Sequence, residues 1–403
     1  MREGWRQITL GDVAETRLGK TLPRGSGQDD DGAPYLRNVN VQWGRIATEN
    51  LNRMPFTAVE RRLLELKRGD ILVCEGGEVG RTALVSEDLE GIYFQNALHR
   101  VRPSSEVVPM FLALSIERFV RSGGLDGIAT RVTIAHLNQT KLRAIQLVLP
   151  PLAEQRRIVD LIAAADDAIA AAEGESAATS AAARSLRSSL FSELKQSHPV
   201  TTVGELFEMK LGRQKSAAQS IGDHVIPYVR AGNITEYGVA GELLTMNFEP
   251  REQEIFRLHE GDVLLAEGGT VGVSARWSGG SEVPVGFDKH VIRIRGRQGV
   301  SISDFAHEWA RWAYQDGVFD RTATGITIRA LGFGRATRIE LPDTPLAQQE
   351  DVVKTLIPIE EAADAARTEA NRLRTLRSNL LTVLLSGEHE IPESYDRFIE
   401  EAA

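Results

Sequence analysis

The stretch that decides the fold is GDILVCEGGEVGRTALV, residues 69–85, because the chain carries it twice. Its second copy, GDVLLAEGGTVGVSARW at 261–277, is identical at nine of seventeen positions without a gap. Other short matches keep the same order at nearly the same offset, which predicts a fold built from two similar halves. These matches are Leu18-Gly19-Lys20 with Leu211-Gly212-Arg213, Pro34-Tyr35-Leu36-Arg37 with Pro227-Tyr228-Val229-Arg230, and Pro151-Leu152-Ala153-Glu154-Gln155 with Pro345-Leu346-Ala347-Gln348-Gln349.

Each repeat begins with a strand-rich part. Short runs of β-branched and apolar residues, such as ILVC at 71–74 and VIRIR at 291–295, are separated by Gly-rich turns. This pattern is typical of a mainly β or α+β region, and one helix is expected inside each, at 110–122 and 304–316. We therefore predict two similar α+β globular domains, at 1–150 and 199–342.

Each repeat ends in a long helix, expected at 151–198 and 343–387. Pro151 and Pro345 stand at the first helical position, which favours proline. Small or apolar residues then recur at alternating steps of four and three, which indicates a heptad seam with one irregular step after Leu373. The principal seam residues are Ile158, Ile162, Ala165, Ile169, Leu186, Leu190, Val352, Leu356, Ile359, Leu373, Leu376 and Leu380.

The two helices are predicted to pack on each other, antiparallel, as a coiled coil, because each alone would expose its apolar stripe. The Ala-rich stretch 163–183, which contains Gly174, could instead be a flexible linker, but alanine favours helix and the seam continues through it. The second helix is four residues shorter, close to one turn, so its seam keeps the same face. Pro358 lies inside it and predicts a bend.

Charge is distributed unevenly along the 403 residues, whose formal net charge is −9. Residues 1–150 hold 20 basic and 18 acidic side chains, residues 199–342 hold 16 and 18, and residues 343–403 hold 6 and 13. The chain therefore ends in an acidic tail, at 388–403, while the two expected domains are nearly neutral. Local basic clusters could bind DNA there, since binding needs only one positive face.

Composition excludes several classes of protein. No apolar run is long enough to span a bilayer, and the sequence shows no secretory h-region. The lone Cys74 cannot form an intramolecular disulfide and fits a reducing compartment. We therefore expect a cytoplasmic protein with no membrane contact.

No catalytic motif emerges from the sequence. Residues 14–21 resemble a phosphate-binding loop, but Ala14 replaces its leading glycine, and the second copy lacks the hydroxyl that would hold magnesium. The Gly-rich segment 75–80 lies between two strand-like runs, which favours a β-turn over a cofactor loop. The eight histidines include no pair at i, i+4, so no metal site is expected. Neither Gly-x-Ser-x-Gly nor the Asn-Pro-Pro-Tyr or Asp-Pro-Pro-Tyr motif of amino-methyltransferases occurs, and we expect no catalysis and no cofactor on this chain.

The order of these motifs resembles the specificity subunit of type I restriction-modification enzymes, over essentially the whole chain. It departs from the pattern at Leu341–Gln349, where two residues separate the prolines, and at Pro358. The marks of the resemblance are the openings Trp5 to Val13 and Val200 to Leu206, the Pro-Tyr-x-Arg-x-x-Asn segments (Pro34, Tyr35, Arg37, Asn40; Pro227, Tyr228, Arg230, Asn233), the Gly-Asp-[Ile/Val]-Leu strand, the Gly-rich turn, and Leu-Pro-Pro-Leu-Ala-Glu-Gln before the long helix.

The resemblance implies a non-catalytic reader of double-stranded DNA. Each globular half would be a target recognition domain for one part of a split, asymmetric site, and the paired helices would set the spacer between the parts. Two copies of a methylation subunit would bind the helical regions and supply S-adenosylmethionine and the base-flipping pocket for adenine methylation. A motor and endonuclease subunit would join them for restriction.

Candidate DNA-contacting residues follow from residue type, because Arg or Lys reads guanine and Asn or Gln reads adenine. Arg37 and Arg230 are shared by both halves, so we expect them to serve structure or phosphate contact; the unshared loops Leu22–Ala33 and Gln214–Val225 are the better candidates for sequence readout. The candidates are Lys20, Arg24, Arg37, Asn38, Asn40, Arg81 and Arg131 in the first half and Arg213, Lys215, Arg230, Asn233, Lys289, Arg329 and Arg335 in the second.

Two other functions stay open from the sequence. A free-standing DNA-binding or scaffold protein with this architecture would need no methylase partner, and co-purification with a methylation subunit separates the two. An enzyme with a cleft between the halves would need a catalytic constellation that the sequence does not contain.

Overall fold

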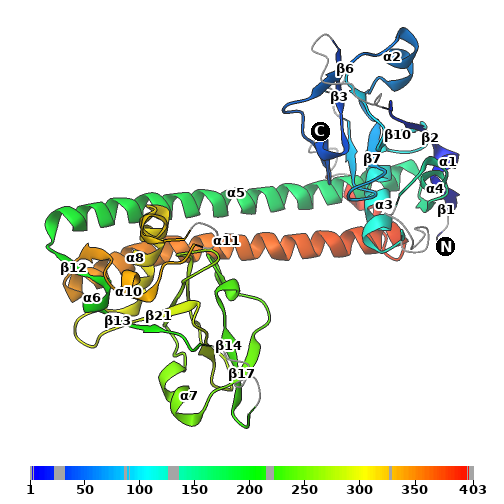
Figure 1. Cartoon of the computed structure of the whole chain (residues 1–403). Helices are drawn as coiled ribbons and strands as arrows, with labels where there is room; N and C mark the ends of the chain where they lie inside the picture. The colour runs from blue at the N-terminus through cyan, green and yellow to red at the C-terminus, as the bar shows by residue number, and fades with distance from the viewer. Residues whose placement is uncertain are drawn as a thin grey trace. The chain divides into compact units, whose positions relative to one another are not determined.

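The computed structural model describes residues 2, 4–21, 32–85, 89, 91–125, 136–214, 222–325, 329–396 and 398. The chain forms two compact units. Unit 1 comprises Met1–Ala171 and Glu369–Ala403, and unit 2 comprises Ala172–Thr368. Both boundaries lie inside long helices, so each unit holds one β-rich region and part of each helix (Figure 1). The domain limits predicted above cut the chain at the helix ends instead and stay a prediction.

The elements of the first β-rich region and those of the second follow the same order along the chain. The first contains β1 (Arg6–Thr9), α1 (Leu10–Val13), β2 (Ala14–Leu18), β3 (Ala33–Leu36), η1 (Asn38–Asn40), β4 (Val41–Gln42), β5 (Arg45–Ile46), β6 (Asn52–Met54), α2 (Ala58–Leu64), β7 (Ile71–Cys74), β8 (Thr82–Leu84), β9 (Tyr93–Phe94), β10 (Leu98–Pro103), α3 (Pro109–Arg121), α4 (Gln139–Arg143) and β11 (Gln146–Leu149). The second contains β12 (Val200–Thr202), α6 (Val203–Leu206), β13 (Phe207–Leu211), β14 (Val225–Val229), η4 (Ala231–Asn233), β15 (Ile234–Thr235), β16 (Gly238–Val239), β17 (Leu244–Asn247), α7 (Pro250–Phe256), β18 (Val263–Ala266), β19 (Ser274–Arg276), β20 (Gly286–Phe287), β21 (Val291–Gly296), α8 (Ser303–Gln315), α9 (Val318–Thr322), α10 (Phe333–Ala336) and β22 (Glu340–Pro342).

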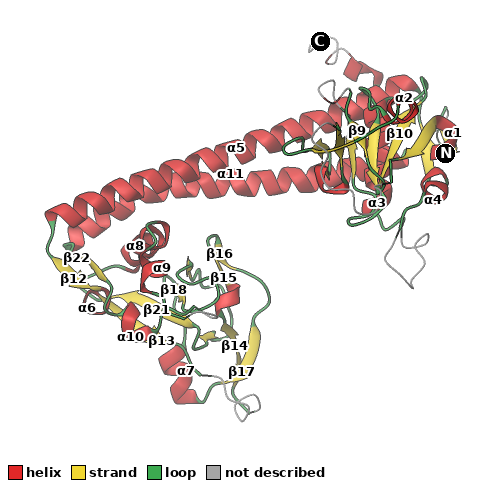
Figure 2. Cartoon of the chain, turned by 45° about the horizontal axis from the view of Figure 1, so that its top comes forward, coloured by secondary structure: helices red, strands yellow, loops and turns green. Residues whose placement is uncertain are grey.

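The sheets of the two units have the same strand order, seen as yellow arrows in Figure 2. A four-stranded antiparallel sheet, β2-β10-β7-β8, corresponds to β13-β21-β18-β19. A mixed three-stranded sheet, β6-β3-β9, corresponds to β17-β14-β20, and two-stranded pairs complete each unit. The repeat read from the sequence is thus a repeat of topology, and the α+β fold class is confirmed.

The Gly-rich segment of each unit joins two antiparallel strands, β7 with β8 and β18 with β19, as the turn prediction requires. Residues 14–18, which begin the apparent phosphate-binding loop, form strand β2. No loop leads from there into a helix that could bind a phosphate, so the nucleotide-site alternative has no structural support within the part of the chain that the structure describes.

Helices α5 (Leu152–Ser197) and α11 (Leu346–Ser386) pack together. Within unit 2 the hydroxyl of Ser176 donates to the carbonyl of Ala363 at 3.0 Å, and within unit 1 Asp166 binds Arg377. As the residue number rises along α5 from Asp166 to Ser176, the number of the partner on α11 falls from Arg377 to Ala363, so the two helices are antiparallel. The Ala-rich stretch is helical throughout, and α11 continues through Pro358.

One seam residue is corrected by the structure. Ile158, Ile162 and Ile169 are buried, as are Val352 and Leu356 of α11. Leu376 is 50% exposed, whereas the next residue, Arg377, is turned inward. The regular step of four from Leu373 therefore continues to Arg377. The sequence argument failed here because it admitted only small or apolar residues to the seam.

Each unit has a hydrophobic core that includes the long helices. In unit 1, Ile158 and Leu384 pack with Val73 and Phe111 of the β-rich region. In unit 2, Phe191 and Leu356 pack with Phe305 and Trp309. A second cluster lies under the three-stranded sheet of each unit. Burying each large apolar side chain contributes about 1.5–3 kcal/mol, so the helix segments are part of each unit's core.

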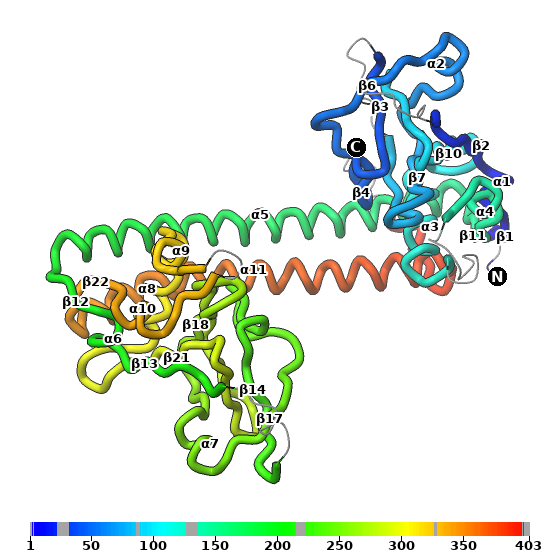
Figure 3. The backbone as a smooth tube through the Cα atoms, viewed as in Figure 1, coloured from blue at the N-terminus to red at the C-terminus, as the bar shows by residue number. Residues whose placement is uncertain are grey.

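The segment after α11 docks on unit 1. Asp396 accepts two hydrogen bonds of 2.6 Å from Arg157 of α5, and this pairing lowers the pKa of the Asp396 carboxyl. Arg2 donates to the carbonyl of His389 at 3.0 Å, and Ile391 is buried. Figure 3 shows the N-terminal strand β1 lying beside β11, with which it pairs antiparallel. The described part of the acidic tail is thus held against the start of α5.

Candidate nucleic-acid interface

Four segments meet beyond the end of strand β2 in unit 1. The backbone N–H of Gln95 donates to the carbonyl of Leu36 at 3.0 Å, and that of Glu75 donates to Ala97 at 2.9 Å. The N–H of Leu137 in turn donates to the carbonyl of Glu75 at 3.1 Å. We call this junction the turn cluster; in unit 1 it comprises residues 37–40, 75–81, 95–97 and 136–138.

Unit 2 builds the same junction from the equivalent residues. Asp288 donates its N–H to Val229 at 3.0 Å, Glu267 donates to His290 at 2.8 Å, and Leu331 donates to Glu267 at 2.8 Å. Its turn cluster comprises residues 230–233, 267–273, 288–290 and 329–332. The two clusters are thus the same backbone frame carrying different side chains.

Glycine is required where the strand end crosses this junction. A Cβ atom on Gly19 would lie 2.2 Å from the carbonyl oxygen of Gln95, and one on Gly212 would lie 2.1 Å from that of Asp288. No side chain fits at such a distance, which explains why both repeats have glycine after the strand.

Lys20 and Arg213 follow these glycines and are both engaged inside the protein. The Lys20 ammonium donates a hydrogen bond of 2.7 Å to Glu60, and this bond lowers the pKa of the Glu60 carboxyl. The same ammonium also donates to the carbonyl of Pro55. The Arg213 guanidinium, whose side chain is 5% exposed, binds Glu252 with two contacts of 2.8 Å. Glu60 belongs to α2 and Glu252 to α7, so each basic residue anchors the end of its strand to a helix. We therefore withdraw both as base-reading candidates.

Asn40 and Asn233 are also structural. Each is buried, and its amide oxygen accepts a hydrogen bond from the backbone of Arg37 or Arg230, at 2.9 and 3.1 Å. The amide nitrogen donates across the turn to Ala47 or Ala240. Both asparagines therefore hold the turn, and their expected contact with bases is corrected.

Arg37 and Arg230 present the shared charge of the two clusters. Both side chains are half-buried, and the Nε atom of each is buried without a hydrogen-bond partner among the described residues. Burial raises the pKa of Asp288, and the hydrogen bond from the His290 backbone N–H, followed by nearby charges that include Arg230, partly lowers it again. A half-buried arginine at the same place in both units suits a contact that both units make, such as a phosphate.

Two further first-half candidates, Arg81 and Asn38, lie at the Gly-rich turn, and within the described part of the chain only Arg81 of the two is fixed there by side-chain hydrogen bonds and an ion pair. Arg81 donates to the carbonyl of Asn38 at 2.7 Å and pairs with Glu78, so it fixes the Gly-rich turn to η1. The Asn38 amide lies over the same turn, where a Cβ on Gly77 would be 3.2 Å from its Nδ2 atom. The equivalent position in unit 2 is Ala231, so the two units can make different contacts at this position.

Three further second-half candidates, Lys289, Arg329 and Arg335, are exposed. Lys289 is exposed and makes only a backbone hydrogen bond, to Arg213, at 2.9 Å. Arg329 pairs with Asp320, and the exposed Arg335 donates to the carbonyl of Ala330 at 3.1 Å. Arg24, Arg131 and Lys215 lie outside the described residues, as does most of the two unshared loops.

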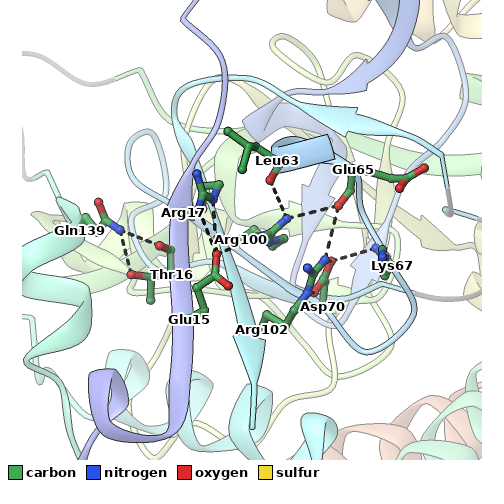
Figure 4. A network of polar contacts seen from close by, with 10 residues as sticks. All are labelled: Glu15, Thr16, Arg17, Leu63, Glu65, Lys67, Asp70, Arg100, Arg102 and Gln139. Atoms are coloured by element: carbon green, nitrogen blue, oxygen red, sulfur yellow. Dashed lines mark hydrogen bonds and ion pairs between the residues drawn. The ribbon is translucent and has the colours of Figure 1, made fainter. Parts of the chain in front are cut away.

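A polar network, missed by the sequence reasoning, joins β2, β10 and the residue before β7 (Figure 4). Asp70 receives two hydrogen bonds from Arg102, at 2.6 and 2.7 Å, and this pairing raises the pKa of Arg102. Arg100 reaches Glu15 and the carbonyls of Leu63 and Glu65. Figure 4 shows the two arginines side by side, projecting from β10.

Unit 2 repeats this network. Arg295 binds Asp262 at 2.6 and 2.8 Å, and Arg293 pairs with Glu208. The signal available in the sequence was the alternation Arg-x-Arg at 100–102 and 293–295 beside Gly-Asp at 69–70 and 261–262. Shared charges at strand spacing indicate the scaffold of the repeat, not its readout.

Another buried group missed by the sequence reasoning explains the repeated Pro-Leu-Ala-x-Gln motif. Gln155 accepts from the N–H of Val108 at 2.8 Å and donates to the carbonyls of Glu106 and Pro150. Gln349 accepts from Ile302 at 3.1 Å and donates to Val300 and Thr344. Each glutamine fastens the start of a long helix to the start of α3 or α8.

The described residues show neither a metal-binding group nor a membrane span. They contain no group of three or more His, Cys, Asp or Glu side chains placed to hold a metal ion. None of their helices is long and apolar enough to cross a membrane.

Comparison with known proteins gives consistent matches. Residues 2–178 match the family described as the type I restriction modification DNA specificity domain. A putative type I restriction enzyme MjaX specificity subunit of Methanocaldococcus jannaschii is 22% identical over 416 residues, which covers 96% of this chain and 94% of that protein. The type I restriction enzyme EcoBI specificity subunit of Escherichia coli is 28% identical over 174 residues, 41% of this chain and 36% of that protein. A putative type I specificity subunit of Haemophilus influenzae is 27% identical, and the match spans 38% of each chain.

Solved structures share the fold. The S subunit of a type I restriction-modification system from M. genitalium matches with a TM-score of 0.57 and 16% identity, over 96% of this chain and 97% of that one. A chain from a study of complex assembly and conformational transition of the type I system matches with a TM-score of 0.58 and 16% identity, over 96% of this chain and 98% of that one.

The duplicated α+β topology and the paired long helices define a two-unit protein in which one backbone frame presents two different sets of side chains. Over nearly its whole length the chain is similar to specificity subunits of type I restriction-modification systems, and residues 2–178 match their DNA specificity domain.

Proposed function

We propose that the two β-rich regions each read one part of a bipartite, asymmetric double-stranded DNA site through their turn clusters. The shared arginines, Arg37 and Arg230, contact phosphate, which fixes register without reading sequence. The neighbouring positions that differ read bases: Asn38 and Asn96 in unit 1, against Ala231 and Lys289 in unit 2.

The observation that carries this proposal is the duplication of the turn cluster. Both clusters have the same backbone hydrogen bonds and the same half-buried arginine. The neighbouring positions, of which Lys289 is exposed and the other three are half-buried, differ in charge and hydrogen-bonding type. A reader of two different sequences on a common backbone needs this combination of shared phosphate contacts and unshared base contacts.

The helices are proposed to set the spacer between the two parts of the site and to dock two copies of a methylation subunit. Those subunits bind S-adenosylmethionine and modify adenine, and a motor and endonuclease subunit joins for restriction. Grooves on one face of B-DNA recur about every 34 Å, so two readers held by stiff helices accept a fixed spacing. The complex is proposed to act in the cytoplasm, where its DNA target lies.

Sequencing of modified adenines in cells that express the chain with its methylation subunit tests this function. The wild-type chain is expected to give one bipartite site. Lys289→Ala should relax sequence preference in one half-site only, with about 1–3 kcal/mol less discrimination at the base contacted. Arg37→Ala should keep both half-sites, weaken binding to all sequences and reduce the salt slope by about 1.

The exposed Arg62 of α2 provides a matched control, since Arg62→Ala removes the same charge outside the turn cluster. A chain that yields no bipartite methylation, or a Lys289→Ala variant that alters both half-sites, would contradict the proposal. A stable complex with the methylation subunit on gel filtration also separates it from a free-standing DNA-binding protein.

A further inference from the structure

One buried arginine joins three helices in unit 2. Arg187 of α5 is fully buried; its Nε atom donates to Glu308 of α8 at 2.7 Å, and its NH2 group pairs with Glu360 of α11. Gln315 of α8 accepts from its NH1 group at 3.4 Å, and Arg311 of α8 reinforces Glu360 at 2.7 Å.

An equivalent arginine joins three helices in unit 1. Arg377 of α11 pairs with Asp166 of α5 through two contacts and with Glu117 of α3 at 3.3 and 3.4 Å. Glu117 also accepts from Arg121 at 2.8 Å. We call the two arrangements the arginine clamps.

The repeat places both clamps at the same position. RSLRSSLF at 184–191 matches RTLRSNLL at 374–381, which pairs Arg187 with Arg377. The acid of each clamp, Asp166 or Glu360, is also repeat-equivalent, at the offset of 194 that the helix starts show. The spacing from acid to arginine is four residues shorter on α11, about one helical turn, so acid and arginine keep a common face on each helix. Loss of a whole turn therefore preserved the clamps.

A buried ion pair on the seam of a helix pair often contributes less stability than a well-packed apolar pair would. Taking an ion pair out of water costs several kcal/mol, which an apolar pair would not. Buried polar groups on a seam are best attested as determinants of register. Each clamp adds a third helix, α3 or α8, and thereby ties the β-rich region to the helix pair at one angle.

The clamp of unit 1 connects by contacts to the turn cluster. Arg121, bound to Glu117, lies over the ring of Trp43 at 4.5 Å. The indole N–H of Trp43 donates to Glu78, and Glu78 pairs with Arg81 of the Gly-rich turn. The side chains that hold the helices and those that shape the candidate DNA surface are thus in one continuous set.

We propose that Arg187 and Arg377 are positioning residues that fix the angle of each β-rich region on the helix pair and so restrict the DNA site to one spacer length. This inference rests on the proposed function. A region about 30 Å deep that tilts by roughly 7° moves its far end by about one base-pair step of 3.4 Å. Small loosening at the clamp is therefore enough to admit a neighbouring spacer.

The test is to map adenine methylation in cells that express the methylation subunit with wild-type chain or with Arg377→Met. Arg377 is chosen because it is 19% exposed, whereas Arg187 is fully enclosed. We expect both half-sites to be unchanged and methylation at spacers one base pair shorter or longer to rise at least about tenfold. Arg377→Lys keeps the charge but loses the planar, two-pronged guanidinium, so its methylation at altered spacers should lie between those of wild type and Arg377→Met.

Arg184→Met is the matched control, because Arg184 is exposed on α5 three residues from Arg187 and should keep the single spacer. If Arg377→Met does not fold, Asp166→Asn combined with Arg377→Met removes the uncompensated charge and is mapped instead. A folded clamp variant that keeps the wild-type spacer overturns this inference alone. Absence of a bipartite site for the wild-type chain overturns the proposed function, and this inference with it.

Discussion

At the scale of single residues, shared polar side chains in the two repeats hold the fold, and unshared ones are left to differ. Asn40 and Asn233 close their turns internally, and Lys20 and Arg213 are bound to Glu60 and Glu252. Residue type alone could not separate these from readers of DNA, because the same amide and guanidinium groups serve both roles. Comparison of the two repeats separates the two roles, because these structural residues are shared by both repeats.

Gln349→Ala is predicted to destabilise the protein by about 2–4 kcal/mol. The change leaves the N–H of Ile302 and the carbonyls of Val300 and Thr344 without their partner in a buried place, and each such group costs about 1–3 kcal/mol. Urea unfolding measures the loss. Gln348→Ala, at the exposed neighbouring position, should change stability by less than about 0.5 kcal/mol; equal effects of the two variants would refute the role of the amide.

Asp288→Asn is predicted to stabilise the protein at neutral pH. Burial raises the pKa of Asp288, so the folded protein holds this proton more tightly than the unfolded chain. Stability then falls as pH rises from about 4 through the raised pKa, and the asparagine variant escapes this loss. The melting temperature should be about 2–4 °C higher than wild type at pH 7, with the gap closing toward pH 4.

The exposed Asp343 serves as the control for that pH profile, because Asp343→Asn removes the same charge from an exposed position instead of a buried one. Its melting temperature should follow wild type at both pH values. An Asp288→Asn gap that does not depend on pH would mean that burial of the charge is not its cause.

At the scale of elements, periodicity predicted the helices and composition predicted the strands, and both predictions were confirmed in kind. The heptad steps extended correctly through the Ala-rich stretch because alanine satisfies both the seam and helix propensity. The rule failed at Leu376, since a seam that accepts only apolar residues cannot place Arg377. The acids that pair with Arg377, Asp166 and Glu117, are distant in sequence, so only the structure shows why an arginine is tolerated there.

At the scale of the whole molecule, the repeat was the observation that made the fold predictable. Offsets between matching motifs gave two α+β regions and two long helices before any strand was assigned. The positions of the candidate site could not be predicted as well, because the turn cluster is assembled by backbone hydrogen bonds between segments far apart in sequence. Only the three-dimensional fold places Arg37 near residues 95–97.

Inserting four residues, about one helical turn, after Ala170 of α5 is predicted to lengthen the accepted spacer and leave both half-sites unchanged. Whole-turn insertion keeps the seam of α5 on nearly the same face, so the packing surface with α11 is retained. Methylation mapping of the variant provides the measurement. Altered bases within a half-site would show that the helices do more than set distance.

The identical fastenings of the two regions have an evolutionary consequence. Gln155 and Gln349 attach each region to its helix, and the paired Arg102 with Asp70 and Arg295 with Asp262 hold each sheet in the same way. A β-rich region that carries other turn-cluster side chains could therefore take the place of either one during evolution, because the contacts that join it to the helices involve none of the positions that differ.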